Sequence, residues 1–268
     1  MEIIEQLDRW NEKYAGWKPS HRDKVDKLDG YPFVTNKLAP FTPARRALTM
    51  MQIALVSSAG AYIDGTDAFD TQAPDGDFQF REIPSEIDLR DLRFAARGYD
   101  AAFVQQDPNV QVPLQRLFEF ESNRIIGQLN SVFWSFSGFI PDAARLTTEM
   151  VPKLIERLHR YDVQAVLLIP ASRLCQQSCG LAARAIEQTG LPTMMLAVER
   201  TTAESVRPPR VAFYEGQFGS VAGEPNWPEH QRRVLDEALR WLEPMGEPGM
   251  LKLAVELESR VEVARGER

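Results

Sequence analysis

Both cysteines of this 268-residue chain lie in one short stretch, ASRLCQQSCG, at Cys175 and Cys179. An apolar run, QAVLLIP, precedes them, and the residues that follow have helical periodicity as far as Gly190. Ser172 is a good N-cap residue for that helix, so Cys175 should lie in its first turn, where free backbone N–H groups favour a negative charge. A thiolate forms more readily at such a position, which makes Cys175 the candidate reactive thiol.

Cys179 is one turn further along the same helix face, where it is a candidate resolving thiol. Packing is the alternative for both residues, because cysteine is often buried as a small apolar side chain. Packing is favoured for Cys179, which precedes Gly-Leu-Ala, and reactivity for Cys175, which has two glutamines beside it. Cβ atoms one helical turn apart are about 6 Å apart, whereas a disulfide needs about 3.5–4.5 Å. We therefore expect two free thiols in an intact helix.

Further candidate residues follow other apolar strands. The strand predicted at Gln52–Val56 runs into SSAGAYIDG, a loop of small residues that could cradle an anion or form only a tight turn. Ligands of open α/β sheets bind beyond the carboxyl ends of the strands. This loop, the turn Ser172–Cys175 and the loop Gly216–Gly223 should therefore converge on one pocket with Cys175 at its floor or rim. The predicted substrate-binding residues are Ser57, Ser58, Gly60, Tyr62, Asn109, Arg116, Gly216, Phe218 and Gly219.

Two of these residues rest on weaker patterns. The motif DPNVQVPLQR supplies Asn109 and Arg116, whose guanidinium could hold a carboxylate, but a turn before a helix explains the motif equally well. The glycines of Gly216–Gly223 would let backbone approach a ligand closely, or they form a flexible surface loop. The aromatic side chains of Tyr62 and Phe218 would exclude water from the thiol. The exclusion of water would strengthen the electrostatic effect of the helix amides on the Cys175 sulfur.

The pattern indicates neither a metal nor an organic cofactor. The histidines, His21, His159 and His230, are scattered, and SSAGAYIDG lacks the glycine pattern of a nucleotide-binding loop. The net charge is −7 and there is no basic run with interleaved aromatics, which argues against nucleic acid as a partner. No apolar window reaches the roughly 18 residues of a membrane span, and the N-terminus has no signal-peptide core. We therefore expect a cytoplasmic homo-oligomer that acts on a small molecule.

Apolar strands alternate with helical stretches, which predicts an α/β fold with a largely parallel sheet flanked by helices. The pattern allows two lobes, an N-terminal α/β lobe at 1–140 and a C-terminal α/β lobe at 141–268 with the cysteine helix and a C-terminal helix. The expected helices are 1–16, Ala44–Met50, the stretch capped by Ser85, Val110–Glu121, Asp142–Tyr161, the cysteine helix, Thr202–Val206, Gln231–Leu242 and Leu251–Val263. The expected strands are Gln52–Val56, Phe78–Ile83, Ala101–Gln105, Arg124–Leu129, Val132–Phe136, Gln164–Ile169, Pro192–Val198 and Arg210–Glu215.

The order and spacing of five segments resemble the selenoprotein B family of glycine/sarcosine/betaine reductases, to which D-proline reductase is related. The segments are ALVSSAGAY, DPNVQVPLQR, SFSGFIPDAARL, VQAVLLIPASRLCQQSCGLAARAIEQTGLPT and GQFGSVAGEPNWPEHQR, and they span roughly residues 30–243. The resemblance implies a U-x-x-C motif, where U is selenocysteine, with Ser172 at the selenocysteine position and Cys175 at the cysteine position. The implied chemistry is selenolate attack on an activated carbon with loss of an amine, transfer to partner subunits, and a reset by thiol reduction.

A serine at position 172 is neither a selenolate nor a soft nucleophile, and it leaves several functions open. The leading hypothesis is a thiol-dependent, reductase-like enzyme that acts on a small anionic amine or related metabolite through Cys175, with a partner reductase subunit or a thiol reductant. Alternatively, Ser172 stands in for selenocysteine, or the chain is a binding or assembly protein that has lost the reaction. An isomerase or racemase with cysteines on opposite lobes is a further alternative, against which the lack of a thiol in SSAGAY speaks.

Overall fold

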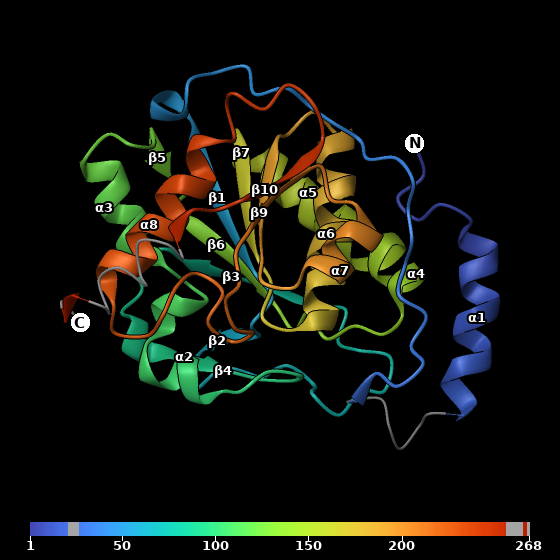
Figure 1. The fold of residues 1–268 in the computed structure, drawn as a ribbon. Helices are drawn as coiled ribbons and strands as arrows, with labels where there is room; N and C mark the ends of the chain where they lie inside the picture. The colour runs from blue at the N-terminus through green and yellow to red at the C-terminus, as the bar shows by residue number, and fades with distance from the viewer. Residues whose placement is uncertain (21–26, 256–264, 267–268) are drawn as a thin grey trace.

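The computed structural model describes residues 1–20, 27–255 and 265–266. At its centre lies one eight-stranded sheet (Figure 1), in which β5 (Gln128–Leu129) pairs with β1 beside β6. The other strands follow the order β10 (Gly249–Lys252), β9 (Arg210–Phe213), β8 (Thr193–Ala197), β7 (Ala165–Ile169), β1 (Gln52–Ser57), β6 (Val132–Phe136) and β3 (Phe80–Pro84). Of the pairings in this sheet, only that of β3 with β6 is antiparallel. The predicted α/β fold with a largely parallel sheet is confirmed.

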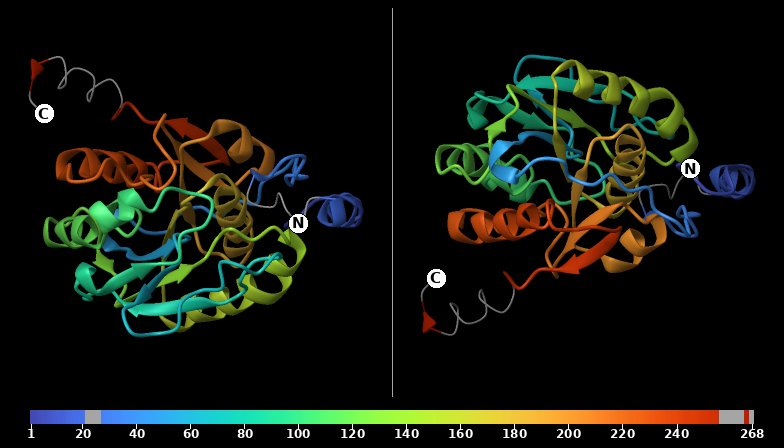
Figure 2. Two further views of the ribbon diagram at one scale, coloured as in Figure 1. Left: turned by 90° about the horizontal axis from the view of Figure 1, so that it is seen from below. Right: turned by 90° about the horizontal axis from the view of Figure 1, so that it is seen from above.

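Helices cover both faces of the sheet, as the views from below and above show (Figure 2). One apolar core holds side chains of α1 (Leu7–Ser20), α5 (Val151–Arg160), α6 (Arg173–Gln188) and α7 (Arg200–Val206). The core on the other face holds side chains of α3 (Leu114–Ser122) and α8 (Pro228–Arg240). The remaining elements are the short helices α2 (Ala102–Gln106) and α4 (Ala143–Arg145), the π-helical turn Leu146–Met150, the 3-10 turns Leu48–Met50, Leu89–Asp91 and Pro108–Val110, and a separate antiparallel pair, β2 (Ala61–Ile63) with β4 (Leu92–Phe94).

The alternation of side chains along the strands explains the two cores. In β1, Ile53 and Leu55 belong to the core with α3 and α8, whereas Ala54 and Val56 belong to the core with α5 and α6. The neighbouring strand β7 alternates in the same way and is buried along its whole length. A strand covered on both faces needs apolar residues at every position, which is why these segments contain no charge.

Strands from both predicted lobes join the same sheet. β1 and β6 belong to residues 1–140 and β7 to residues 141–268, and β1 pairs with both of these neighbours. The carboxyl ends of the central strands lie at the lower edge in Figure 1, where α2, β2 and β4 are also found. This edge is the one at which the predicted site residues were expected. The division into two lobes stays a prediction.

Some local predictions are wrong. The predicted strand Ala101–Gln105 is the helix α2, since a short apolar run does not distinguish strand from helix without its tertiary contacts. Ser85 caps no helix, because its hydroxyl instead donates to the backbone oxygen of Asn130 over 2.7 Å. The predicted helix Ala44–Met50 is reduced to its last turn, where no side chain caps the helix start.

Two predicted elements at other positions are only partly found. The predicted strand Arg124–Leu129 is reduced to β5, because residues 124–127 form a turn after α3. The predicted C-terminal helix Leu251–Val263 begins with residues of β10, which pairs with β9. Most of the remainder of that helix, residues 256–263, lies outside the described residues.

Candidate active site at the start of helix α6

Cys175 lies in the first turn of α6, as predicted from the sequence. The Ser172 hydroxyl accepts a hydrogen bond from the Cys175 backbone N–H over 3.2 Å, and Ser172 itself has an extended backbone. These are the features of a helix N-cap. Both cysteines are free thiols, which is the expected state for side chains one turn apart in an intact helix.

Three loops meet at this corner of the sheet. The loop after β1 contributes Ser58, whose Oγ accepts from the Ala171 N–H over 3.0 Å and whose backbone oxygen lies 3.7 Å from the Cys175 Sγ. The loop after β9 contributes Gly219, whose N–H donates to the Ala171 oxygen over 2.8 Å. The loops surround packed side chains rather than an open pocket, since Cys175 is only 1% exposed.

Burial raises the pKa of the Cys175 thiol above its ordinary value, and desolvation is the largest influence on it. Four donors act in the opposite direction by hydrogen bonding to the thiolate. They are the hydroxyls of Ser172 and Ser58 and the backbone N–H groups of Ser172 and Ala171. The sequence-based expectation of a low Cys175 pKa is therefore wrong for the covered thiol, because desolvation outweighs these donors.

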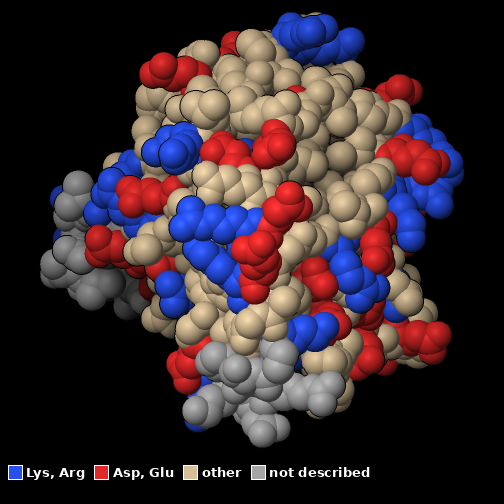
Figure 3. Space-filling view, turned by 90° about the vertical axis from the view of Figure 1, so that its right-hand side faces the viewer, with Lys and Arg blue, Asp and Glu red and all other residues tan. Residues whose placement is uncertain are grey.

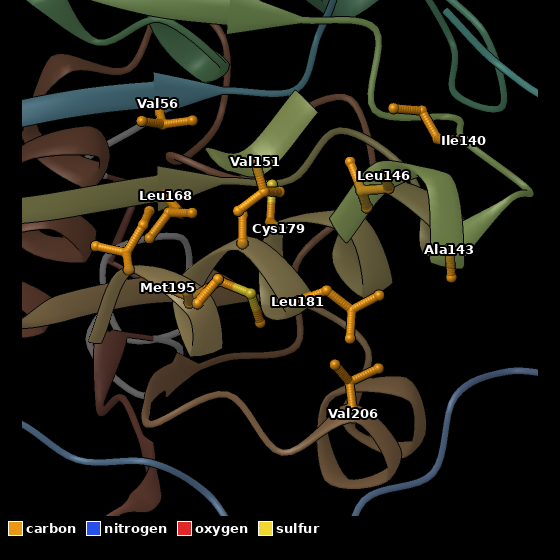
Figure 4. Packing of buried hydrophobic residues seen from close by; sticks show 14 of the residues in the cluster. Val56, Ile140, Ala143, Leu146, Val151, Leu168, Cys179, Leu181, Met195 and Val206 are labelled. Atoms are coloured by element: carbon orange, nitrogen blue, oxygen red, sulfur yellow. The ribbon is translucent and has the colours of Figure 1, made fainter. Parts of the chain in front are cut away.

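Cys179 lies deeper, in the apolar core between α6 and the sheet. Figure 4 shows its side chain beside Val151, among residues such as Val56 and Leu168, and its exposed fraction is 0%. Burial raises the pKa of this thiol, and the neighbouring Cys175 raises it further. These surroundings agree with a packing role for Cys179, and its role as a resolving thiol stays a prediction.

The end of β4 and the irregular segment that follows it, as far as α2, cover the thiol. The rings of Phe94 and Tyr99 pack against a small group of side chains, Ala59, Ala171 and Cys175, which we call the thiol cluster. The Tyr99 hydroxyl donates to the Ala59 backbone oxygen over 2.6 Å. The cover therefore combines apolar contact with one short hydrogen bond to the loop after β1.

Two glycines bring backbone close to the cysteine corner, and neither was among the site residues predicted from the sequence. Gly98 has a φ of +77°, and a Cβ there would lie 2.5 Å from the Phe139 ring. A Cβ on Gly138 would lie 2.5 Å from the Ser58 Cβ and 3.1 Å from the Cys175 Sγ. Gly138 could have been found, since it follows the strand β6 in the forward direction. Gly98 lies in an irregular segment and gives no such signal.

Tyr62 and Asn109 line a cleft of about 1110 Å³ at the same edge of the sheet. Its walls come from residues 85–90, 92–94 and 104–109, and from Leu114, Gln115 and Phe118. Cys175 is not among the lining residues, so this cleft and the thiol are adjacent but separate. The structure thus divides the predicted site residues into a group around the thiol and a group along the cleft.

Asn109 and Arg116 belong to a bonded network beside the cleft. The Asn109 amide donates to Asp107 over 3.0 Å and to Gln115 over 2.9 Å. Arg116 forms an ion pair with Glu119 over 2.8 Å, and the exposed fraction of its side chain is 9%. Both residues therefore have protein partners.

The same network joins two of the segments that carry the family resemblance. Asp107 accepts hydrogen bonds from the Gln231 amide over 2.6 Å and from the Asn226 N–H over 3.0 Å. The Ala222 N–H donates to the Val110 oxygen over 2.8 Å. These bonds fix the loop after β9, and that loop in turn contacts Ala171.

The other predicted residues shape the loops. Ser57 is fully buried at the end of β1, and Gly60 has a φ of +69° with its Cβ position 2.8 Å from the Ala95 oxygen. Gly216 leaves no room for a Cβ beside the Tyr214 ring, and Phe218 packs at the edge of the core that contains α8.

Acidic and basic side chains are interleaved on the face that carries α1 (Figure 3). In the parts of the chain that the structure describes, no helix has both the length and the apolar character needed to cross a membrane. The same residues contain no group of three or more His, Cys, Asp and Glu side chains placed to share a metal ion.

A family model described as glycine/sarcosine/betaine reductase selenoprotein B matches residues 24–171, more than half of the chain. The chain belongs to this family. The family assignment confirms the resemblance seen in the sequence, and the match ends at Ala171, just before Ser172. No solved structure matches the chain at a significant level.

Curated members of the reductase systems are similar to most of the chain. D-proline reductase subunit gamma of Acetoanaerobium sticklandii is 30% identical over 202 residues, which are 75% of this chain and 82% of that protein. Sarcosine reductase complex component B subunit beta of Peptoclostridium acidaminophilum is 29% identical, over 65% of this chain and 41% of that protein. Glycine reductase complex component B subunit gamma of Symbiobacterium thermophilum is 23% identical, over 80% of this chain and 52% of that protein. The chain thus spans about half of each component B subunit or less.

Proposed function

We propose that this chain is a subunit of a multi-component reductase and that Cys175 is its nucleophilic or redox thiol. Family membership supports the class, since the similar proteins are named as subunits of D-proline, sarcosine and glycine reductases. The observation that carries the proposal is geometric: Cys175 lies in the first turn of α6, which the Ser172 hydroxyl caps, and its sulfur lies 3.7 Å from the Ser58 backbone oxygen. A cysteine that serves only as packing needs no helix start beside it, whereas a thiolate nucleophile is stabilised there.

The proposed substrate is a small anionic amine or a related metabolite. The Cys175 thiolate attacks the carbon that bears the protonated or quaternary nitrogen, so that a C–S bond forms and the C–N bond breaks with its electron pair going to nitrogen. The amine then leaves, or it stays on the opened chain when the substrate is cyclic, as D-proline is. A dithiol of a partner subunit or of a small reductant is then oxidised to a disulfide while the C–S bond is reduced. Ser58 and Ser172 stabilise the thiolate, and Tyr62 and Asn109 contact substrate in the cleft.

Turnover in this scheme requires the thiol to be uncovered. Burial raises the Cys175 pKa, so the covered thiol is protonated near neutral pH. Contact with solvent removes the desolvation cost, while the four donors remain in place at the start of α6. Movement of the side chains that cover the thiol would therefore expose and activate it in one step.

The test is covalent trapping. The purified chain is incubated in four separate reactions, each with dithiothreitol and one of D-proline, sarcosine, glycine and betaine. Tandem mass spectrometry is then used to search for an adduct on Cys175. We expect an adduct with one of them, together with amine release or, for D-proline, a ring-opened adduct that keeps the amine, and the loss of these products in Cys175→Ser. Cys179→Ala is the control and should keep the adduct. Amine release that persists in Cys175→Ser would exclude the proposal. The proposal would also be excluded if no substrate formed an adduct even in Ser172→Cys, which restores a second sulfur.

A non-catalytic binding or assembly subunit is the second candidate, favoured by the 1% exposure of Cys175 and its raised pKa. This function predicts that Cys175→Ser and Ser172→Cys leave binding to partner subunits unchanged and that no adduct forms. An isomerase gains no support, because both cysteines lie on α6 rather than on opposite sides of a site.

A further inference from the structure

The cleft and the thiol cluster share one side chain. Phe94, the last residue of β4, lines the cleft of about 1110 Å³ and also packs against the thiol cluster. Tyr99, the other ring on the thiol cluster, does not line the cleft. Among the residues that the structure describes, Phe94 alone belongs to both groups. The phenyl ring of Phe94 therefore forms the partition between the cleft and the thiol.

The Tyr99 side of the cover is held at several points. The Tyr99 hydroxyl donates to the Ala59 oxygen over 2.6 Å. Two residues earlier, the Arg97 guanidinium donates to the Ala73 oxygen over 2.7 Å and lies 4.5 Å from the centre of the Phe139 ring. A path to the thiol on this side requires these interactions to break together, which makes such an opening costly.

Phe94 is held differently. Its backbone is fixed by the pairing of β4 with β2, in which Phe94 lies opposite Ala61. Its half-buried ring can make no strong hydrogen bond; it also packs against the edge of the core that contains α3 and α8, and it borders the open cleft. Rotation between staggered side-chain conformations is fast for a ring with room beside it. The ring can therefore leave the thiol cluster while the backbone stays in place.

We propose that Phe94 is the gate between the cleft and Cys175, and that small molecules reach the thiol from the cleft when the ring rotates. The role in substrate access rests on the proposed function, but the passage itself is a property of the fold. A gate of one phenyl ring also limits the size of what can pass. Phe94 would thus be a specificity-determining residue that does not itself react.

The gate is tested by the rate at which Cys175 of the folded chain reacts with methyl methanethiosulfonate, a small uncharged thiol reagent. Tandem mass spectrometry separates labels on Cys175 from labels on Cys179. We expect Phe94→Ala to react at least about tenfold faster than wild type, since a covered group reacts in proportion to its open population. Phe118→Ala is the matched control, because Phe118 lines the same cleft but is not packed on the thiol cluster. Its rate should stay within about twofold of wild type.

A second pair of variants addresses the rival path. Tyr99→Phe removes only the hydrogen bond to Ala59, and Tyr99→Ala removes the ring. The gate is overturned if either Tyr99 variant reacts faster than Phe94→Ala. It is also overturned if Phe118→Ala is accelerated as much as Phe94→Ala. Circular dichroism confirms folding, and Phe94→Val replaces Phe94→Ala if the latter does not fold.

The labelling result also separates the gate from the proposed function. Faster labelling in Phe94→Ala supports the gate even where no substrate adduct forms in any variant. The lack of an adduct then removes only the reductase proposal. A substrate adduct on wild-type Cys175 together with unchanged labelling in Phe94→Ala removes the gate and leaves the reductase proposal intact.

Discussion

The hydroxyl of Ser172 accepts a hydrogen bond from the backbone N–H of Cys175 over 3.2 Å. The same hydroxyl can hydrogen bond to the Cys175 thiolate, which lowers the pKa of that thiol. One side chain thus begins helix α6 and stabilises the charge that the proposed chemistry needs. The resemblance to the family implies selenocysteine at this position, and under the proposed function the serine there supports the remaining sulfur.

The two roles of Ser172 can be separated by substitution. Ser172→Ala should lower the free energy of unfolding by about 1 kcal/mol, whereas Ser172→Gly should lower it by only roughly a few tenths, because glycine is a tolerable N-cap and alanine is not. Both variants lack the hydroxyl, so both should raise the Cys175 pKa by a similar amount. Urea unfolding and the pH dependence of thiol labelling measure the two effects. An equal loss of stability in the two variants would argue against the cap.

The buried thiols should make the fold less stable at alkaline pH. Burial raises the pKa of Cys175 and Cys179 in the folded state, so the unfolded chain releases these protons at lower pH. Their contribution is fully present below the unfolded thiol pKa of about 8.5 and is lost as the pH rises toward the folded values. We expect the free energy of unfolding to fall above about pH 9 by up to about 1.4 kcal/mol per pH unit for each thiol. Urea unfolding at a series of pH values measures this slope.

The control for this slope is the variant Cys175→Ser/Cys179→Ala. Tyr14, Tyr31 and Tyr99 also have raised pKa values because of burial, but unfolded tyrosine titrates only near about pH 10. The slope between about pH 8.5 and 10 should therefore be smaller in the double variant. Identical slopes in the two proteins would show that the thiols do not contribute.

The corner around Cys175 was predictable because its signals are local. A buried strand, a good N-cap residue and a periodic helix occupy consecutive positions, and all of them are found in the structure. The burial of the thiol was not predictable in this way, since its covering residues lie about 80 residues earlier in the chain, Phe94 at the end of the three-residue strand β4 and Tyr99 in the irregular segment after it. The direction of the Cys175 pKa shift depends on that burial, so it could not be derived from the helix start alone.

A buried ion pair, Glu187 with Arg210, joins α6 to β9. Both side chains are fully buried, and Glu187 also accepts from the Thr193 N–H over 2.8 Å. Glu187→Gln leaves an unpaired buried guanidinium, so the free energy of unfolding should fall by about 3–5 kcal/mol. The exposed pair Arg200–Glu204 provides the control, where Glu204→Gln should cost about 0–1 kcal/mol. Urea unfolding that gave the same small loss for both variants would contradict the prediction.

Gly138 holds the loop after β6 against the thiol corner. Its N–H donates to the Ser58 oxygen over 3.0 Å, and its own oxygen accepts from the Ser178 hydroxyl over 2.8 Å. These bonds prevent the loop from moving away to admit a side chain. A Cβ at this position would lie 2.5 Å from the Ser58 Cβ and 3.1 Å from the Cys175 Sγ, so one of these residues must shift.

We expect Gly138→Ala to lower the free energy of unfolding by about 1–3 kcal/mol, the usual cost of overpacking. Displacement of Ser58 would also remove a donor from the Cys175 thiolate, so the pKa of that thiol should rise further. Gly16→Ala is the matched control, because Gly16 lies in α1 with no heavy atom within 4 Å of its Cβ position. That change should raise stability by about 0.5–1 kcal/mol, since glycine is unfavourable inside a helix. Urea unfolding and the pH dependence of Cys175 labelling measure both effects, and a Gly138→Ala protein with wild-type stability and labelling would disprove the close packing of this loop on the thiol.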